Sequence, residues 1–356
     1  MNHHPIPNSY FAAANTADGF DSRFPALFDP RSGEWQKIYI IKGGPGTGKS
    51  AFMKRAAEYA EKRGLTVERY YCSSDTRSLD GIRIPARGIA MLDGTAPHTV
   101  DAVYPGAVEE IINMGMFFDA CALREHADAI RALHTENAEH HLRAKRFLRA
   151  AGAVRGVERG LLAGAWLPEK AAAAASRLVQ RIPQVVEPVC DMQFVTAISV
   201  QGVVHLPPAE RAGQCVRVTD GGRAALFFDA LTEAADRRGV SYTRYASPLN
   251  PEETEGIWFP DIGTAYFSDR YGGDEQDGDV PARPLNTARF FDAAALSARR
   301  SRLRFAHKCE QTLMEGACEA LASAGAVHDA LEAHYIAAMD FDALNAFTAR
   351  FLHGFL

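Results

Sequence analysis

Apolar runs and helix-forming stretches alternate along the first quarter of the chain. An apolar run at 38–41 ends in a glycine-rich turn, and the stretch 51–63 that follows has helical spacing and stops at Gly64. Further strands are predicted at the β-rich segment 66–71 and at the apolar run 88–93, and 79–85 contains another short apolar piece. This alternation favours an α/β fold, with a mostly parallel sheet flanked by helices in three layers.

The pattern elsewhere indicates one short strand and several helices. Residues 10–14 are apolar and precede a turn, whereas 108–114 has the spacing of a short helix. The stretch 119–150 is strongly helical, and a second helical stretch at 158–181 is broken near Pro168. These two stretches predict a helical insertion.

The chain also repeats itself. Residues 51–64 read AFMKRAAEYAEKRG and residues 226–239 read LFFDALTEAADRRG. The correspondence keeps one offset of 175 residues (Gly81 to Gly256) and resumes at 173 residues (Phe117 to Phe290). We therefore predict a tandem duplication of one α/β unit. The predicted parts are a first domain at 1–155, a helical connector at 156–190 and a second domain at 191–356.

The glycine-rich turn matches the phosphate-loop pattern G-x-x-x-x-G-K-[ST] between a predicted strand and a predicted helix. Glycines allow backbone N–H groups to approach phosphate oxygens, and a helix N-terminus favours anions. The lysine would reach the β- and γ-phosphates of a nucleotide, and the serine hydroxyl would bind Mg²⁺. The predicted binding residues are Gly43, Gly44, Pro45, Gly46, Thr47, Gly48, Lys49, Ser50 and Ala51.

Asp93 ends the apolar run 88–93, as expected of a strand that delivers a carboxylate to the Mg²⁺ shell beside Ser50. The predicted catalytic residues are Lys49, Asp93 and Asp75, with Asp75 at the tip of the second strand as the first choice for orienting the nucleophile. The alternatives for that role are Asp80 and His98. Arginines that could neutralise phosphate charge are Arg77, Arg83 and Arg87, although arginines in such positions more often lie on the surface without a catalytic role.

The second copy has lost these groups. Ala224 and Ala225 occupy the positions of Lys49 and Ser50, in a loop shortened around Gly221 and Gly222. Ser268 replaces Asp93 and Asn250 replaces Asp75. We therefore interpret the second copy as a degenerate domain without a phosphate site.

Two other groups of polar residues have simpler explanations. The acidic loop with Asp274, Glu275, Asp277 and Asp279 lacks the closing glutamate of an EF-hand, which favours a solvated loop over a Ca²⁺ site. His126, His134 and His141 are too widely spaced for a metal site, which favours an exposed or interfacial helix face.

Composition narrows the functional classes. The 356 residues carry a net charge of -5 and no sustained basic run, so nucleic acid is not an obvious partner. The six cysteines are dispersed, and neither a signal peptide nor a bilayer-spanning apolar run is visible. These features predict a cytoplasmic protein that does not act in a membrane.

Four motifs resemble an uncharacterised bacterial family of duplicated P-loop ATPases. They are K-G-G-P-G-T-G-K-S at 42–50, C-S-S-D-x-x-S-L-D-G at 72–81, D-G-T-A-P-H at 93–98 and Y-P-G-A-V-E-E-I-I-N at 104–113. The resemblance implies nucleotide binding and ATP hydrolysis without identifying a substrate. Members of the family can keep a phosphate loop in both halves, and this chain departs from them there.

We expect ATP as the nucleotide, because no N-K-x-D element for guanine is present, and Mg²⁺ as the metal. The favoured function is an ATPase with one site in the first half and a regulatory or structural second half. A small-molecule kinase and a non-catalytic nucleotide-sensing module are the alternatives. A protein partner, a small-molecule acceptor and the oligomeric state stay open.

Overall fold

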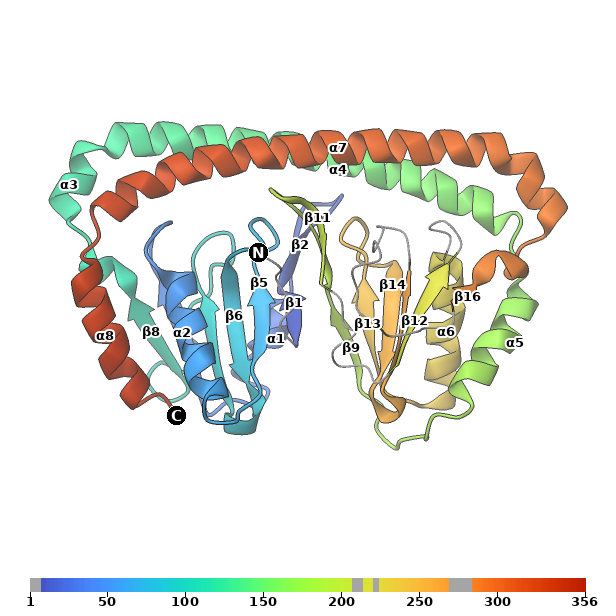
Figure 1. Cartoon of the computed structure of the whole chain (residues 1–356), viewed down its shortest axis with the longest axis horizontal. Helices are drawn as coiled ribbons and strands as arrows, with labels where there is room; N and C mark the ends of the chain where they lie inside the picture. The colour runs from blue at the N-terminus through green and yellow to red at the C-terminus, as the bar shows by residue number, and fades with distance from the viewer. Residues whose placement is uncertain (1–7, 207–213, 220–223, 269–283) are drawn as a thin grey trace.

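The computed structural model describes residues 8–206, 214–219, 224–268 and 284–356. These residues form two six-stranded mixed sheets that stand side by side beneath a pair of long helices (Figure 1). The first sheet has the order β1 (Ser9–Phe11), β5 (Glu68–Tyr71), β6 (Leu79–Ile84), β7 (Ile89–Asp93), β4 (Lys37–Lys42) and β8 (Glu109–Asn113). The second has the order β9 (Cys190–Gln193), β13 (Tyr242–Ala246), β14 (Thr254–Phe259), β15 (Thr264–Ser268), β12 (Gln214–Thr219) and β16 (Leu285–Asn286).

The two sheets have the same topology, as expected of a duplicated unit. Only β6 in the first sheet and β14 in the second run against their neighbours. A helix follows the equivalent strand in each half, α2 (Lys49–Glu61) after β4 and α6 (Ala225–Arg238) after β12. Gly88 and Gly263 both have positive φ at the end of equivalent 3-10 turns, where a glycine is favoured. The internal repeat seen in the sequence is therefore also a repeat of structure.

Most predicted elements of the first half are confirmed, and two predictions are wrong. The strands β4, β5 and β7 and the helix α2 lie where the pattern predicted them, and β6 occupies the short apolar piece at 79–85. One helix runs through 127–163, where two separate helical stretches at 119–150 and 158–181 were expected. The short helix predicted at 108–114 is instead the edge strand β8, which pairs in parallel with β4. A short apolar run fits a helical or an extended period almost equally well. Here the segment pairs with β4 at the edge of the sheet, which makes it a strand. The strand predicted at 10–14 is divided into β1 and β2 (Ala13–Asn15), which pairs with β3 (Phe20–Ser22).

Long helices join the two halves. After the short α3 (Ala120–Glu125), α4 (Ala127–Ala163) crosses from the first half to the second, and α7 (Ala293–Ala337) crosses back beside it (Figure 1). At 1.5 Å per residue, the 45 residues of α7 alone span about 68 Å. Small residues let the two helices approach, with Ala144, Leu148 and Ala151 packed against Ala317 and Leu321. This antiparallel pair is called the hairpin below.

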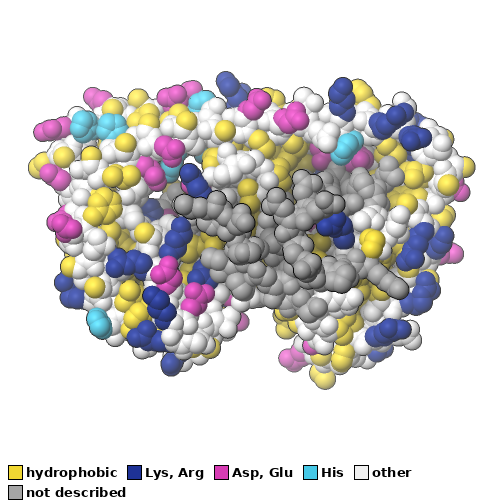
Figure 2. Space-filling model, in the orientation of Figure 1, with side chains coloured by type: hydrophobic (Ala, Val, Ile, Leu, Met, Phe, Trp, Pro, Cys, Tyr) yellow, Lys and Arg dark blue, Asp and Glu magenta, His cyan; other side chains and the backbone are white. Residues whose placement is uncertain are grey.

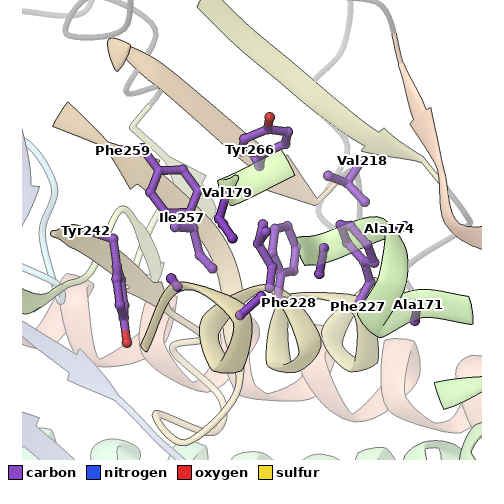
Figure 3. Close-up of a cluster of buried hydrophobic side chains, with 14 of the residues drawn as sticks. Ala171, Ala174, Val179, Val218, Phe227, Phe228, Tyr242, Ile257, Phe259 and Tyr266 are labelled. Atoms are coloured by element: carbon purple, nitrogen blue, oxygen red, sulfur yellow. The ribbon is translucent and has the colours of Figure 1, made fainter. Parts of the chain in front are cut away.

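Each helix of the hairpin is followed by a helix that packs on the other half of the molecule. The copy that begins in the first half thus ends on the second half, and the copy that begins in the second half ends on the first. Helix α4 ends at Ala163, and α5 (Pro168–Val179) follows it. Ala171 and Ala174 of α5 pack against Phe227 and Phe228 of α6 (Figure 3). Pro168 stands in the first turn of α5, as the sequence predicted for the break.

In the other direction, α8 (Phe341–His353) follows α7 and packs on α2 of the first half. The ring of Phe351 lies 5.0 Å from that of Phe52. Each hydrophobic core is therefore completed by a helix that lies beyond the hairpin. The predicted domain boundaries stay a prediction. The two packed halves do not coincide with the two copies, because each half includes a helix from the other copy.

The inner faces of the two sheets share one hydrophobic cluster. It unites Ile40 and Leu92 of the first sheet with Tyr245 and Phe267 of the second. The short helix α1 (Phe24–Leu27) fills the same cluster, and the backbone N–H of Phe11 donates to the carbonyl of Phe194 between β1 and the start of the second unit. Helices α2 and α8 thus cover one outer face and α6 and α5 the other. Within the described residues, no helix is both long and apolar enough to cross a bilayer.

Candidate functional site

The glycine-rich loop lies between β4 and α2, as its sequence context predicted. Gly46 has a φ of +67° and Gly48 a φ of +82°, a backbone conformation that side chains with a Cβ rarely adopt. Gly48 is the N-cap of α2, so helix begins directly at Lys49. The loop therefore turns around the positive end of the helix dipole.

Lys49 and Asp93 meet at this loop. The Lys49 Nζ donates to the carbonyl of Gly44 at 2.7 Å and lies 3.5 Å from an Asp93 carboxylate oxygen. Both side chains are largely buried, with exposed fractions of 11% and 16%. The strand order explains the meeting, because β7 is the direct neighbour of β4 and Asp93 is in register with Ile41.

Neighbouring hydroxyls orient the loop and the carboxylate. Thr95 donates from its backbone N–H and from its hydroxyl to one oxygen of Asp93, which leaves the other oxygen to face Lys49. The Ser50 hydroxyl accepts from the N–H of Leu79 at the start of β6, and Thr47 donates to the carbonyl of Gly44.

A serine hydroxyl and a carboxylate supply the hard oxygen donors that suit Mg²⁺, with the remaining ligands left to phosphate and water. The described residues contain no cluster of three or more His, Cys, Asp or Glu side chains able to hold a metal ion by themselves. By the chemistry of their oxygens alone, Ser50 and Asp93 are suited to contribute ligands to Mg²⁺.

Asp75 lies at the contact between the two halves. Its carboxylate accepts two hydrogen bonds from the Arg77 guanidinium at 2.8 and 2.9 Å, one from the Arg77 backbone N–H at 3.1 Å and one from the Gln201 amide at 2.8 Å. Gln201 belongs to the turn between β10 (Thr196–Ser199) and β11 (Gly202–His205) of the second half. Burial favours the neutral form, but these hydrogen bonds hold the pKa of Asp75 below its ordinary value. The described contacts of Asp75 thus connect the halves, and its predicted catalytic role stays a prediction.

The two alternative nucleophile-orienting residues pair with each other. His98 Nε2 lies 3.2 Å from the Asp80 carboxylate, and both side chains are buried. The His98 ring stacks on Phe24 on the inner side of the sheet, 4.2 Å between centroids. Among the candidate arginines, Arg83 forms ion pairs with Glu34 and Glu68, which are structural contacts.

The sequence did not reveal that the hairpin covers the loop. Glu332 of α7 accepts a hydrogen bond from the backbone N–H of Gly46 at 3.0 Å, across 286 residues of chain. Tyr335 packs so closely on Gly44 that an added Cβ there would lie 2.7 Å from its ring. Leu344 of α8 lies in the same way against Gly48. No local pattern could indicate these contacts, because they depend on the crossing of the helices.

The carboxylate of Glu332 sits in a positive environment. His328, one turn earlier on α7, lies 3.4 Å from it. The pKa of Glu332 is lowered, first by the hydrogen bond from His328 and further by the Gly46 amide and the charge of Lys49, while burial opposes these effects. The loop therefore holds a carboxylate as an anionic ligand.

The corresponding place in the second half has a different character. Ala224 is fully buried in the hydrophobic core, and Ala225 starts α6. Ser268 ends β15 beside β12, where Asp93 ends β7 beside β4. Gly221 and Gly222 of the shortened loop, and the acidic loop with Asp274, Glu275, Asp277 and Asp279, lie outside the described residues.

The predicted histidine face agrees with the structure in its broad outline. His126 and His134 are exposed, and His141 is half-buried beside the hairpin partner. Burial, followed by the charges of His328 and His140, lowers the pKa of His141.

An open cleft of about 470 Å³ lies at the corner between α7 and α8. Its walls come from both halves of the sequence. They are formed by Met116, Phe117, Phe118, Asp119, Ala122, Ala337, Ala338, Met339, Asp340 and Ala343. The cleft begins one residue beyond Ile336, which packs on Gly46.

Comparison with protein-family models, with curated proteins and with solved structures finds no match for this chain. The family resemblance drawn from the four motifs therefore stays a prediction, and the site has to be interpreted from its own geometry.

Proposed function

We propose that this chain is an ATP-binding P-loop protein that hydrolyses ATP with Mg²⁺ at a single site in its first half. The observation that carries the proposal is the meeting of Lys49 and Asp93 at a loop whose Gly46 amide already binds an anion. An ammonium, a carboxylate and backbone N–H donors at one helix N-terminus are the groups that a nucleotide phosphate with its metal requires.

The proposed roles follow from the positions of the side chains. The loop amides and Lys49 would bind the phosphates, and Lys49 would neutralise charge that develops on the transferred group. Ser50 and Asp93 would hold Mg²⁺, which polarises the phosphate oxygens when bound. Freed from its contact with Asp93, the Lys49 ammonium can turn toward a phosphate without leaving the loop.

The second half has no equivalent of these groups, which supports a single site. Alanine side chains at 224 and 225 provide neither a positive charge nor a hydroxyl, and Ala224 is part of the core. We assign the second half a regulatory or structural role, because its helices α7 and α8 cover the loop of the first half.

The test is a comparison of Lys49→Ala with Lys62→Ala. Both remove one lysine from the region of α2, but Lys62 is exposed at the far end of the helix. We expect Lys49→Ala to abolish ATP binding or to lower phosphate release at least about a hundredfold, by analogy with the loss of one electrostatic group at a reaction centre. The Lys62→Ala variant should behave as wild type. Equal activity of both variants would refute the proposed function.

A small-molecule kinase is the second candidate, and the open cleft between α7 and α8 favours it. Its volume of about 470 Å³ lies within the range of small-molecule sites, and its lining residue Ala337 directly follows Ile336, which packs on Gly46. Phosphate release without an added acceptor supports the ATPase, whereas ADP formation that depends on an acceptor supports the kinase. Tight binding without ADP formation under either condition would leave a nucleotide sensor.

A further inference from the structure

Glu332 occupies a donor that the loop would otherwise offer to a phosphate. The Gly46 N–H points at the Glu332 carboxylate at 3.0 Å, and a single N–H cannot donate fully to a carboxylate and to a phosphate oxygen. The carboxylate is also attracted by Lys49, the residue proposed to bind the same phosphates. Glu332 and a nucleotide therefore compete for one set of groups.

The helix that carries Glu332 is in close contact with the loop. An added Cβ would lie 2.7 Å from Tyr335 at Gly44 and 2.9 Å from Ile336 at Gly46. Residues 332–344, called the α7–α8 corner below, thus close over the loop on the side of the Gly46 amide. Phosphates cannot reach this amide unless Glu332 turns away or the corner moves.

The opposite end of the hairpin is held by ion pairs between arginines and carboxylates. Arg159 of α4 corresponds to Glu332 in the repeat, and its guanidinium pairs with Asp229 of α6, which corresponds to Lys54. Arg155 pairs with Glu253 and Glu255, and all three side chains are buried, with exposed fractions of 4%, 6% and 7%.

Charge therefore separates the two ends of the hairpin. Histidine and acidic side chains gather above the first half, and many Lys and Arg side chains lie at the end above the second half (Figure 2). An incoming anion can replace the Glu332 carboxylate at the first end. It cannot replace Arg159 at the second, because the groups that Arg159 contacts there are carboxylates.

We propose that Glu332 is a phosphate-mimicking carboxylate that keeps the α7–α8 corner closed on the loop until a nucleoside triphosphate displaces it. This inference rests on the proposed function, since it requires that the loop binds nucleotide. Displacement frees the corner of α7 and α8, while Arg155 and Arg159 keep the other end of the hairpin attached to the second half. Nucleotide binding in the first half is thereby coupled to the position of a helix encoded in the second.

Two variants of Glu332 test the competition by the affinity for a non-hydrolysable ATP analogue with Mg²⁺. Glu332→Gln keeps the shape and a weaker acceptor, and Glu332→Ala removes the acceptor. If the closed contact holds about nine-tenths of the molecules, its removal tightens binding about tenfold. We expect Glu332→Ala to bind tightest and Glu332→Gln to fall between it and wild type. Glu319→Ala, an exposed glutamate on the same helix, is the matched control and should leave affinity unchanged.

Hydrogen exchange without nucleotide tests the contact itself. In Glu332→Ala, the amides of 43–50 and of 326–340 should exchange faster than in wild type, and nucleotide should produce the same change at 326–340 of wild type. Unchanged exchange in both segments would overturn the contact as a restraint. Unchanged protection of 326–340 on nucleotide binding would overturn the displacement.

The outcomes separate this inference from the proposed function. If wild type binds the analogue and Lys49→Ala does not, but Glu332→Ala binds with wild-type affinity, the competition is refuted and the nucleotide site stands. The same holds if Glu332→Ala only lowers turnover, because Glu332 would then act in the reaction. If neither wild type nor Glu332→Ala binds the analogue, the proposed function fails and the displacement fails with it.

Discussion

The exchange of helices can be tested at Leu344, which belongs to the second copy by sequence and to the first half by packing. Leu344 is 6% exposed and lies among Phe52, Met53 and Met114 of the first core. Its side chain also contacts the loop at Gly48. We therefore expect Leu344→Ala to destabilise the half of the molecule that is most distant from it in sequence.

The size of the effect follows from the burial. Truncation of leucine to alanine removes three carbon atoms from an almost fully buried side chain, worth about 0.8 kcal/mol each or about 2.4 kcal/mol in total. The cavity left at the α2–α8 contact adds to this, because rigid neighbours relax only in part. Together the loss of unfolding free energy should be about 2.5–4 kcal/mol, near the lower end of measured leucine truncations.

Urea unfolding measures the total loss, and hydrogen exchange locates it. Exchange should rise in β4 and α2, residues 37–61, and should stay unchanged in α6. Leu142→Ala is the matched control, because the same truncation at a side chain that is 49% exposed should change stability by less than about 0.5 kcal/mol. A loss below about 1 kcal/mol for Leu344→Ala, or new exchange confined to 225–268, would refute the assignment of α8 to the first core.

Two further predictions concern charges at the ends of the hairpin. Arg155→Leu leaves the buried carboxylates of Glu253 and Glu255 without this guanidinium and should lower the unfolding free energy by about 3–5 kcal/mol in urea; a loss below about 1 kcal/mol would show that the network is not a restraint. Because the pKa of Glu332 in the folded protein lies below its unfolded value of 4.5, first through His328, its stabilisation is present above that pH and is lost as the pH falls. The stability difference between wild type and Glu332→Gln should therefore shrink between about pH 5 and about pH 3, and a difference that grows in acid would contradict this sign.

Local patterns were sufficient for the loop and its two flanking elements. Glycines at 46 and 48 are required by positive φ, and the apolar run of β4 followed by the helical period of α2 leaves little choice of structure. The repeat then extended this prediction to the second sheet. By contrast, the sequence predicts a helix where the edge strand β8 lies, because five residues are too few to distinguish a helical from an extended period.

Strand order and helix partners could not be predicted in the same way. The sequence of an apolar strand does not specify which strand pairs with it. The adjacency of β7 and β4, which brings Asp93 to Lys49, is therefore known only from the fold. The sequence does not indicate on which half the apolar faces of α5 and α8 are buried, because the two halves are copies of each other. Glu332 could not be predicted to contact the loop, because that contact depends on which half α7 and α8 pack against.

The crossing of the hairpin also explains how a copy without phosphate-binding groups is tied to the function of the other. The second half lacks counterparts of Lys49 and Asp93, yet its chain supplies Glu332 and Leu344 to the intact loop. The first half in return supplies α5, whose alanines fill the core around Phe227. Neither half retains a complete core without the other, so the second half keeps its structural contacts with the first whether or not it binds phosphate. Under the proposed function, the ion pairs of Arg159 follow the same division. Carboxylates can fix the end of the hairpin above the second half, whereas the end above the proposed phosphate site is held by a carboxylate that phosphate can replace.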